Sequence, residues 1–294
     1  MRLLKNKLAK RTMVVLTGVP SFLVLLIIAG LFLKARPILA ENSFFSLLSS
    51  SVWAPSRGQF GLFPFIMGTF WVTLAALVLA VPVSLLSAIY LSEYAPCRLR
   101  EIAKPAVDLL AGLPSVIYGV WGMLLIVPLV GRFLAPAFGR SSSGYTVLAG
   151  GIVLAIMIFP TIISVSLEVF GSIPYGMREA SLSLGATKWE TVKHVVLKKG
   201  AQGVIAAVVL GLSRALGETM AVLMVVGNIP RVPKSLFDGG YPLPALIANN
   251  YGEMMSVPLY DSALMLAAGV LLLIVLVFNI LARLILVRVE RRTA

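Results

Sequence analysis

Six apolar stretches limit what this chain can fold into. They cover about residues 13–33, 65–91, 105–130, 145–170, 201–226 and 260–287. A helix of about 20 residues crosses the hydrocarbon core of a bilayer, so each stretch is long enough for one span. Hydrophobic residues make up 59% of the 294 positions and charged residues only 13%, far from the composition of a soluble domain. The sequence therefore predicts an all-α integral membrane protein with six transmembrane helices, forming one domain over residues 13–287 and surrounded by membrane lipid.

The placement of Lys and Arg predicts how these spans are oriented. A net charge of +13 suggests a nucleic-acid partner in a soluble protein, but here the basic residues flank the apolar stretches, and we expect no such partner. Seventeen of them lie at the chain ends or after the second and fourth stretches, whereas the other three loops hold seven. Since cytoplasmic loops carry the excess of Lys and Arg, we expect both termini to be cytoplasmic, with a basic segment at 1–12 and a tail at 288–294. We expect the first span to be retained, because its apolar run is longer than that of a signal peptide.

Few residues are available for catalysis or for binding a metal. Cys97 and His194 are the only cysteine and the only histidine, and the surroundings of His194 contain no signature of a Ser or Cys nucleophile. The sequence also lacks the G-x-x-x-x-G-K-[ST] pattern that cradles the phosphates of ATP. We therefore expect a chain that is not an enzyme and that binds no metal or cofactor itself.

Two opposite charges interrupt the fifth apolar stretch. Arg214 and Glu218 are four residues apart, so on a continuous helix they share one face. A charge at the centre of a span costs about 2.5–3.5 kcal/mol, which makes a functional role the default interpretation. A guanidinium presents a planar fork that suits a tetrahedral oxyanion, and a carboxylate can accept a hydrogen bond from a protonated one. The pair predicts a substrate pathway, and an internal salt bridge that fixes helix packing is the alternative.

Small residues predict how the fifth span packs. Gly203, Ala207, Gly211 and Ala215 recur at every fourth position of this stretch. Such a strip lets two helix backbones approach closely within a membrane. We therefore expect the fifth span to lie against another helix rather than to face lipid on all sides.

The segment between the fourth and fifth spans predicts a helical hairpin. Residues 172–199 read SIPYGMREASLSLGATKWETVKHVVLKK. A short helix through Leu184 and a turn at Gly185 precede a second helix that carries one apolar face. That face consists of Trp189, Val192, Val195 and Val196. We expect this stripe to bind a partner protein, and a stripe that lies on the membrane surface is the alternative.

The hairpin resembles the EAA motif of ABC-importer permeases. In words, the motif is Glu-Ala-Ala, three residues, Gly, nine residues, Ile, one residue and Leu-Pro. Glu179, Ala180, Gly185 and Leu197 match it, whereas Ser181, Val195 and Lys198 replace the second alanine, the isoleucine and the proline. The resemblance implies the type I ABC importer permease fold and a coupling helix within 172–199 that sits in a cleft of an ATPase subunit. It further implies that Arg178 and Glu179 fix the hairpin against that subunit.

Three further segments are similar to the PstC-type permeases of phosphate importers. They are LLAGLPSVIYGVWG at 109–122, GLSRALGETMAVLMVVGN at 211–228 and LPALIANNYGE at 243–253. This resemblance implies phosphate as cargo, a place in the cytoplasmic (inner) membrane and a PstA-like permease as partner. It also implies two PstB-like subunits that bind ATP with magnesium, and an external phosphate-binding protein.

Other functions stay open on the residues alone. The charged pair is equally compatible with sulfate, molybdate or phosphonate as cargo. It is also compatible with an ion-coupled secondary transporter in which Glu218 carries a proton, and with a membrane scaffold that contains a structural ion pair.

Overall fold

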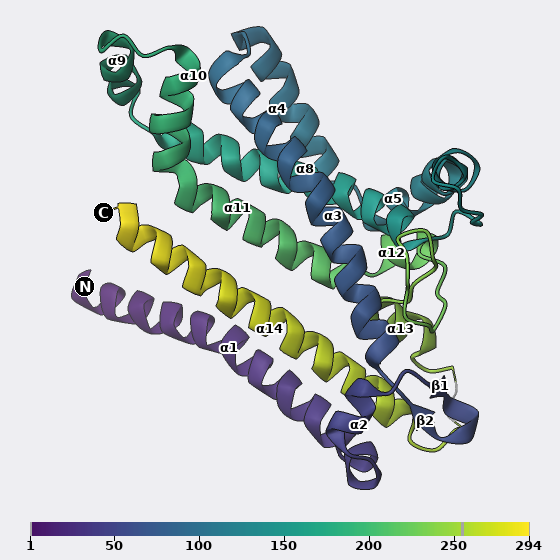
Figure 1. Ribbon diagram of the computed structural model, residues 1–294. Coiled ribbons are helices and arrows are strands. Elements are labelled where there is room, and N and C mark those ends of the chain that lie inside the picture. The colour runs from purple at the N-terminus through teal and green to yellow at the C-terminus, as the bar shows by residue number, and fades with distance from the viewer. Residues whose placement is uncertain (1, 254–255, 294) are drawn as a thin grey trace.

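Six long helical segments run through the computed structural model, which describes residues 2–253 and 256–293 and the side chains of 9–253 and 256–288. Within that part of the chain, six helices are long and apolar enough to cross a membrane. They are Ala9–Glu41, Phe63–Tyr94, Ser115–Ala137, Val147–Ser172, Lys188–Gly217 and Tyr260–Arg288. The predicted all-α fold with six spans is confirmed. The start of the first helix and the end of the last lie at the same end of the bundle, as an even number of crossings requires (Figure 1).

Several of these spans are assembled from more than one helical piece. The main helices are α1 (Arg2–Glu41), α3 (Phe63–Ile89), α5 (Ser115–Trp121), α6 (Val127–Leu129), α7 (Ala135–Ala137), α8 (Val147–Ser172), α10 (Lys188–Thr191), α11 (Leu197–Gly217) and α14 (Tyr260–Thr293). Wider π-helical turns at Tyr90–Tyr94, Gly122–Ile126, Val130–Leu134 and Val192–Val196 continue or join these pieces. The second, third and fifth spans therefore contain local irregularities of the kind that often occur near functional sites.

Shorter elements connect the spans. They are α2 (Phe44–Ser49), β1 (Trp53–Ala54), a 3₁₀ turn (Pro55–Arg57), β2 (Gln59–Phe60), α4 (Cys97–Ala111), α9 (Tyr175–Ser183), α12 (Met220–Val225) and α13 (Leu243–Asn250). The two strands pair antiparallel, with Trp53 opposite Phe60. Figure 1 shows that α2, β1, β2 and α13 lie at one end of the bundle, and that α9 and α10 lie at the other, near the chain ends.

The contact between α3 and α8 forms the centre of the bundle. Val72 and Ala76 of α3 and Leu154 of α8 are buried together. A Cβ atom on Gly151 would lie 2.7 Å from the side chain of Ala75, so glycine allows the two helices to approach closely. Thr146 caps the start of α8, and its hydroxyl accepts a hydrogen bond from the backbone N–H of Ala149. By contrast, α1 is exposed along its apolar length and lies beside α14 (Figure 1).

The third predicted stretch, 105–130, does not form one helix. Its first part belongs to α4, which ends at Ala111, and the third span begins only at Ser115. Pro114 explains the interruption, because proline has no N–H and disfavours a helical conformation at the residue before it. The apolar run therefore crosses a backbone break, and the predicted bounds of this span were wrong.

The fifth predicted stretch, 201–226, also differs from the observed helix. A continuous helical segment runs from Lys188 to Gly217, and α12 begins separately at Met220. Glu218 has an extended backbone with φ −70° and ψ 127°, which ends α11. At the other end, Lys198 replaces the proline of the EAA motif and has a backbone N–H, so the helix enters the span without a break.

The small residues of the fifth span pack against α8, as predicted. A Cβ atom on Gly211 would lie 2.9 Å from the side chain of Ile162, and one on Gly203 would overlap Val169. Ala207 and Ala215 are buried on the same side of α11. This close approach places the residues of α11 directly beside those of α8.

Candidate functional site

Arg214 lies in the last turn of α11 and points toward α8. Its Nη1 donates a hydrogen bond of 2.9 Å to the hydroxyl oxygen of Thr161. Because the carbonyl groups at the end of a helix carry partial negative charge, the end of α11 also favours a cation at this position. The side chain is half-buried, with Ala215 and Leu216 buried next to it. The structure thus holds a guanidinium between two packed spans.

Glu218 is not the partner of Arg214. Among the described side chains, ion pairs within 4.0 Å join only Arg178 with Glu93 and Lys34 with Asp261. The carboxylate of Glu218 instead accepts hydrogen bonds from the backbone N–H groups of Thr219 at 3.1 Å and Ala221 at 3.3 Å. The prediction of a shared helical face was wrong, because the helix ends between the two residues.

A row of polar side chains extends from Arg214 along α8. Thr161, Ser164 and Glu168 follow each other at helical spacing and therefore lie on one side of α8. Ser164 donates a hydrogen bond of 3.4 Å to the carboxylate of Asp108, which belongs to α4. The row thus brings an aspartate to within about one helical turn of the hydroxyl that Arg214 contacts.

Sequence reasoning missed Asp108 and Glu168 as candidate site residues. A signal was present, because both are carboxylates inside predicted apolar stretches. The relation of Asp108 to Arg214 was not accessible, since it depends on α4 being a separate helix that packs beside α8.

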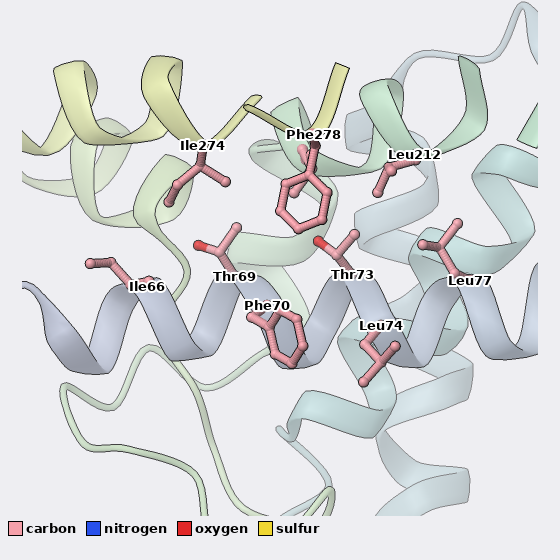
Figure 2. A pocket seen from close by; sticks show the side chains of 10 residues that line it. Ile66, Thr69, Phe70, Thr73, Leu74, Leu77, Leu212, Ile274 and Phe278 are labelled. Atoms are coloured by element: carbon pink, nitrogen blue, oxygen red, sulfur yellow. The ribbon is translucent and has the colours of Figure 1, made fainter. Parts of the chain in front are cut away.

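The apolar cavity between α3, α11 and α14 has a different character (Figure 2). It has a volume of about 200 Å³ and is lined by Ile66, Thr69, Phe70, Thr73, Leu74, Leu77, Leu212, Leu216, Ile274 and Phe278. Figure 2 shows Thr69 and Thr73 pointing from α3 toward α14, with hydrocarbon around them. An oxyanion would lose its hydration there without a charged partner, so this cavity does not suit such a substrate.

The predicted hairpin is present directly after the C-terminal end of α8. It consists of α9, a turn at Gly185 with φ +85°, and α10. Thr187 and Glu190 form a capping box, in which the Thr187 N–H donates to the Glu190 carboxylate at 2.7 Å and the Glu190 N–H donates to the Thr187 hydroxyl at 3.3 Å. The hydroxyls of Ser181 and Thr191 share a hydrogen bond of 2.9 Å, which ties α9 to α10.

The apolar stripe expected to bind a partner is mostly used inside the protein. Val192 and Val196 are buried against Phe170, in a cluster that also includes the end of α3. The exposed apolar side chains lie nearer the tip of the hairpin, where Leu184 is 90% and Trp189 is 53% exposed. The predicted stripe was therefore wrong in its composition, and the tip offers a smaller apolar surface.

The residues matching the EAA motif are not equally accessible. Glu179, Ala180 and Gly185 are exposed, and Leu197 is half-buried. Arg178 is turned into the protein, where its Nη2 lies 2.7 Å from the carboxylate of Glu93. The expectation that Arg178 contacts an ATPase does not fit this position, whereas Glu179 remains available for such a contact.

No metal site accompanies these residues in the part of the chain that the structure describes, where no group of three or more His, Cys, Asp or Glu side chains could hold an ion. Together with Arg214 and Asp108 beside it, the polar row along α8 offers one guanidinium, two hydroxyls and two carboxylates. This set can bind an anion reversibly through hydrogen bonds and charge, but it contains no activated nucleophile.

The hairpin and the arrangement of the spans agree with a known family. The family described as binding-protein-dependent transport system inner membrane component matches residues 80–294. This chain belongs to that family. It is therefore a multi-pass membrane transport subunit rather than an enzyme, in agreement with the sequence-based expectation.

Several named proteins are similar to this chain. A phosphate transport system permease protein PstC from Xylella fastidiosa (strain 9a5c) is 40% identical over 261 aligned positions, covering 84% of this chain and 80% of that protein. A PstC from Mesorhizobium japonicum is 35% identical over 294 aligned positions, covering 94% and 90%. A solved inward-facing structure of the MetNI methionine ABC transporter superposes with a TM-score of 0.57 at 20% identity, covering 81% of this chain and 96% of that chain. The chain thus has the type I ABC importer permease fold.

Proposed function

We propose that this chain is the permease subunit of an ATP-driven phosphate importer and forms part of the phosphate pathway. The position of Arg214 carries the proposal, because its guanidinium lies at the end of a transmembrane helix and contacts a hydroxyl rather than a carboxylate. The names of the relatives from Xylella fastidiosa and Mesorhizobium japonicum support phosphate as the cargo.

The polar row suits a protonated tetrahedral oxyanion. Arg214 supplies positive charge and N–H donors, and the hydroxyls of Thr161 and Ser164 can donate or accept. Asp108 can accept a hydrogen bond from the protonated oxygen of hydrogen phosphate but repels a fully deprotonated anion. One guanidinium opposed by nearby carboxylates binds weakly, and a pathway must release its cargo as well as accept it.

The hairpin is proposed to receive the energy for transport. We assign Glu179, Ala180 and Gly185, together with the exposed tip residues Leu184 and Trp189, to the contact with an ATPase subunit. Because α10 continues into α11, a displacement of the hairpin moves the helix that carries Arg214. Hydrolysis of ATP with magnesium belongs to two PstB-like partner subunits in this scheme.

The proposal also includes an orientation of the chain in the membrane and a set of partner proteins. We place the chain in the cytoplasmic membrane with both termini and the hairpin in the cytoplasm, since the excess of Lys and Arg lies at that end. A PstA-like permease completes the pathway from the other side, and an external phosphate-binding protein delivers the cargo to the end that contains α2 and α13.

Uptake into vesicles tests the proposal. We would reconstitute the chain with its candidate partners, then measure ATP-driven uptake of labelled phosphate with sulfate as competitor, for the wild type and for Arg214→Gln. We expect uptake that needs ATP, resists sulfate and is lost in the variant. Arg140→Gln, on an exposed residue outside the spans, is the matched control and should transport normally.

Each result that differs from this expectation points to a different alternative function or role. Discontinuous spans also form substrate sites in secondary transporters, so uptake driven by a proton gradient without ATP would replace the proposal with an ion-coupled mechanism. Effective competition by sulfate would indicate a permease for another oxyanion. Normal uptake by Arg214→Gln would assign this arginine to helix packing.

A further inference from the structure

The inward-facing side chain of Arg178 links α9 to the end of the second span. Its Nη2 and Nε lie 2.7 and 3.2 Å from the two carboxylate oxygens of Glu93, a bidentate arrangement. Both side chains are nearly buried, at 11% and 10% exposure. Because a forked ion pair shielded from water has a defined geometry, it fixes both the distance and the orientation between α9 and the end of α3.

The two partners of this ion pair are held in place by further hydrogen bonds. Arg178 also donates to the carbonyl oxygens of Ile173 at 2.7 Å and Phe170 at 2.8 Å, where α8 ends. Arg100 at the start of α4 donates to the carbonyl oxygens of Leu91 at 2.8 Å and Ser92, the two residues that precede Glu93 in the same turn. The ion pair therefore joins two segments that are each fixed locally, and movement at one segment is transmitted to the other.

The second span continues from Glu93 to the opposite end of the bundle. There the hydroxyl oxygen of Thr69 accepts a hydrogen bond of 2.9 Å from the backbone N–H of Leu243, which begins α13. A Cβ atom on Gly68 would lie 2.9 Å from the carbonyl oxygen of Tyr241, so α3 and the segment before α13 are in close backbone contact. Thr69 and Glu93 are 24 residues apart, which corresponds to about 36 Å along a helix.

We propose that the Glu93–Arg178 ion pair couples the hairpin to α13 through α3. A displacement of α9 is delivered to Glu93, and the second span carries it to the segment at Tyr241–Leu243 on the opposite end. Glu93 and Arg178 are thus positioning residues for transport, in addition to the direct covalent link from the hairpin into the fifth span. The inference rests on the proposed function, since it requires an ATPase that moves the hairpin.

Transport stoichiometry tests this coupling. In the reconstituted complex, phosphate moved per ATP hydrolysed is measured for the wild type, Glu93→Gln and Arg178→Lys. Both variants should lower this ratio by about fivefold or more, because coupling between two sites typically changes an equilibrium by at least that factor. ATP hydrolysis should continue in both. Arg178→Lys retains the buried positive charge and loses only the fork, so it separates loss of coupling from loss of folding.

Asp261→Asn is the matched control. It breaks the exposed ion pair with Lys34, whose atoms are 3.9 Å apart, and should leave the ratio unchanged. If Asp261→Asn lowered the ratio as much as Glu93→Gln does, or if neither Glu93→Gln nor Arg178→Lys lowered it, the inference would be overturned.

A distance measurement provides a readout that a purely structural role would not change. Spin labels at exposed Ala248 in α13 and exposed Ser56 in the turn between the strands report on the outer end of the molecule. We expect the distance to change when ATP is added to the wild-type complex and to stay constant in Arg178→Lys. An equal change in both proteins contradicts the inference while leaving the proposed function intact. A wild-type complex that takes up no phosphate contradicts the proposed function itself.

Discussion

Arg214 of α11 donates a hydrogen bond of 2.9 Å to the hydroxyl of Thr161 on α8, at the point where α11 ends. The interaction joins two spans that approach closely through Gly211 and Ile162. The guanidinium is therefore oriented by a neutral acceptor, and its charge is not cancelled by a carboxylate within 4.0 Å among the described side chains. An arginine held in this way can respond to an incoming anion without first breaking an ion pair.

Replacing Thr161 by valine tests this orientation. The change keeps the shape of the side chain and removes the acceptor, which leaves Arg214 less well positioned. A hydrogen bond to a charged group contributes about 1.5–3 kcal/mol, so we expect phosphate uptake to fall about tenfold or more at low phosphate concentration. Thr17→Val on exposed α1, where the hydroxyl bonds only within its own helix, should transport normally. Unchanged uptake by Thr161→Val would show that this hydrogen bond does not position the pathway arginine.

Asp108→Asn tests whether the carboxylate on α4 discriminates between oxyanions. Asparagine preserves the size of the side chain but removes the charge that repels a fully deprotonated anion. We expect sulfate to inhibit phosphate uptake at a concentration about tenfold lower than in the wild type, as the loss of one charged hydrogen bond implies. Glu101→Gln on the same helix is exposed and serves as control. Equal sulfate inhibition of the wild type and Asp108→Asn would remove Asp108 from the specificity determinants.

Gly211→Val tests the close approach of α11 and α8. A Cβ atom at this position would lie 2.9 Å from the Ile162 side chain, so the two helices must separate. We expect a loss of about 1–3 kcal/mol in the free energy of unfolding, measured as a lower melting temperature in detergent. Gly18→Val on α1 meets no atom within 4 Å and should melt like the wild type. Similar melting of all three proteins would contradict the packing described for this strip.

The spans and the hairpin could be predicted because hydropathy and helical periodicity encode them directly. The spacing of Gly203, Ala207, Gly211 and Ala215 predicted a helix–helix contact for the same reason. Hydropathy does not record backbone breaks, however. The run that contains Pro114 is apolar on both sides, and only the proline indicates that two helices meet there.

The candidate site was less predictable, because it depends on competition between side chains and backbone. The spacing of Arg214 and Glu218 implies proximity only on a continuous helix. The carboxylate of Glu218 instead binds the N–H groups of Thr219 and Ala221, an alternative that helical spacing does not reveal. Likewise, periodicity grouped Val192 with Trp189, although Val192 packs inside the protein and Trp189 remains exposed.

The tip of the hairpin offers the last test. Leu184 and Trp189 are exposed apolar side chains on the two sides of the Gly185 turn, where a cleft of an ATPase subunit can bury them. Because a few buried anchors dominate most interfaces, Leu184→Ser should cost about 1 kcal/mol or more of binding and reduce ATPase co-purification. Glu179→Lys should have a larger effect, since it also reverses a charge. Phe45→Ser changes another highly exposed apolar residue, on α2 at the opposite end of the bundle, and should retain the ATPase. Full co-purification with both hairpin variants would mean that another surface of the chain binds the ATPase.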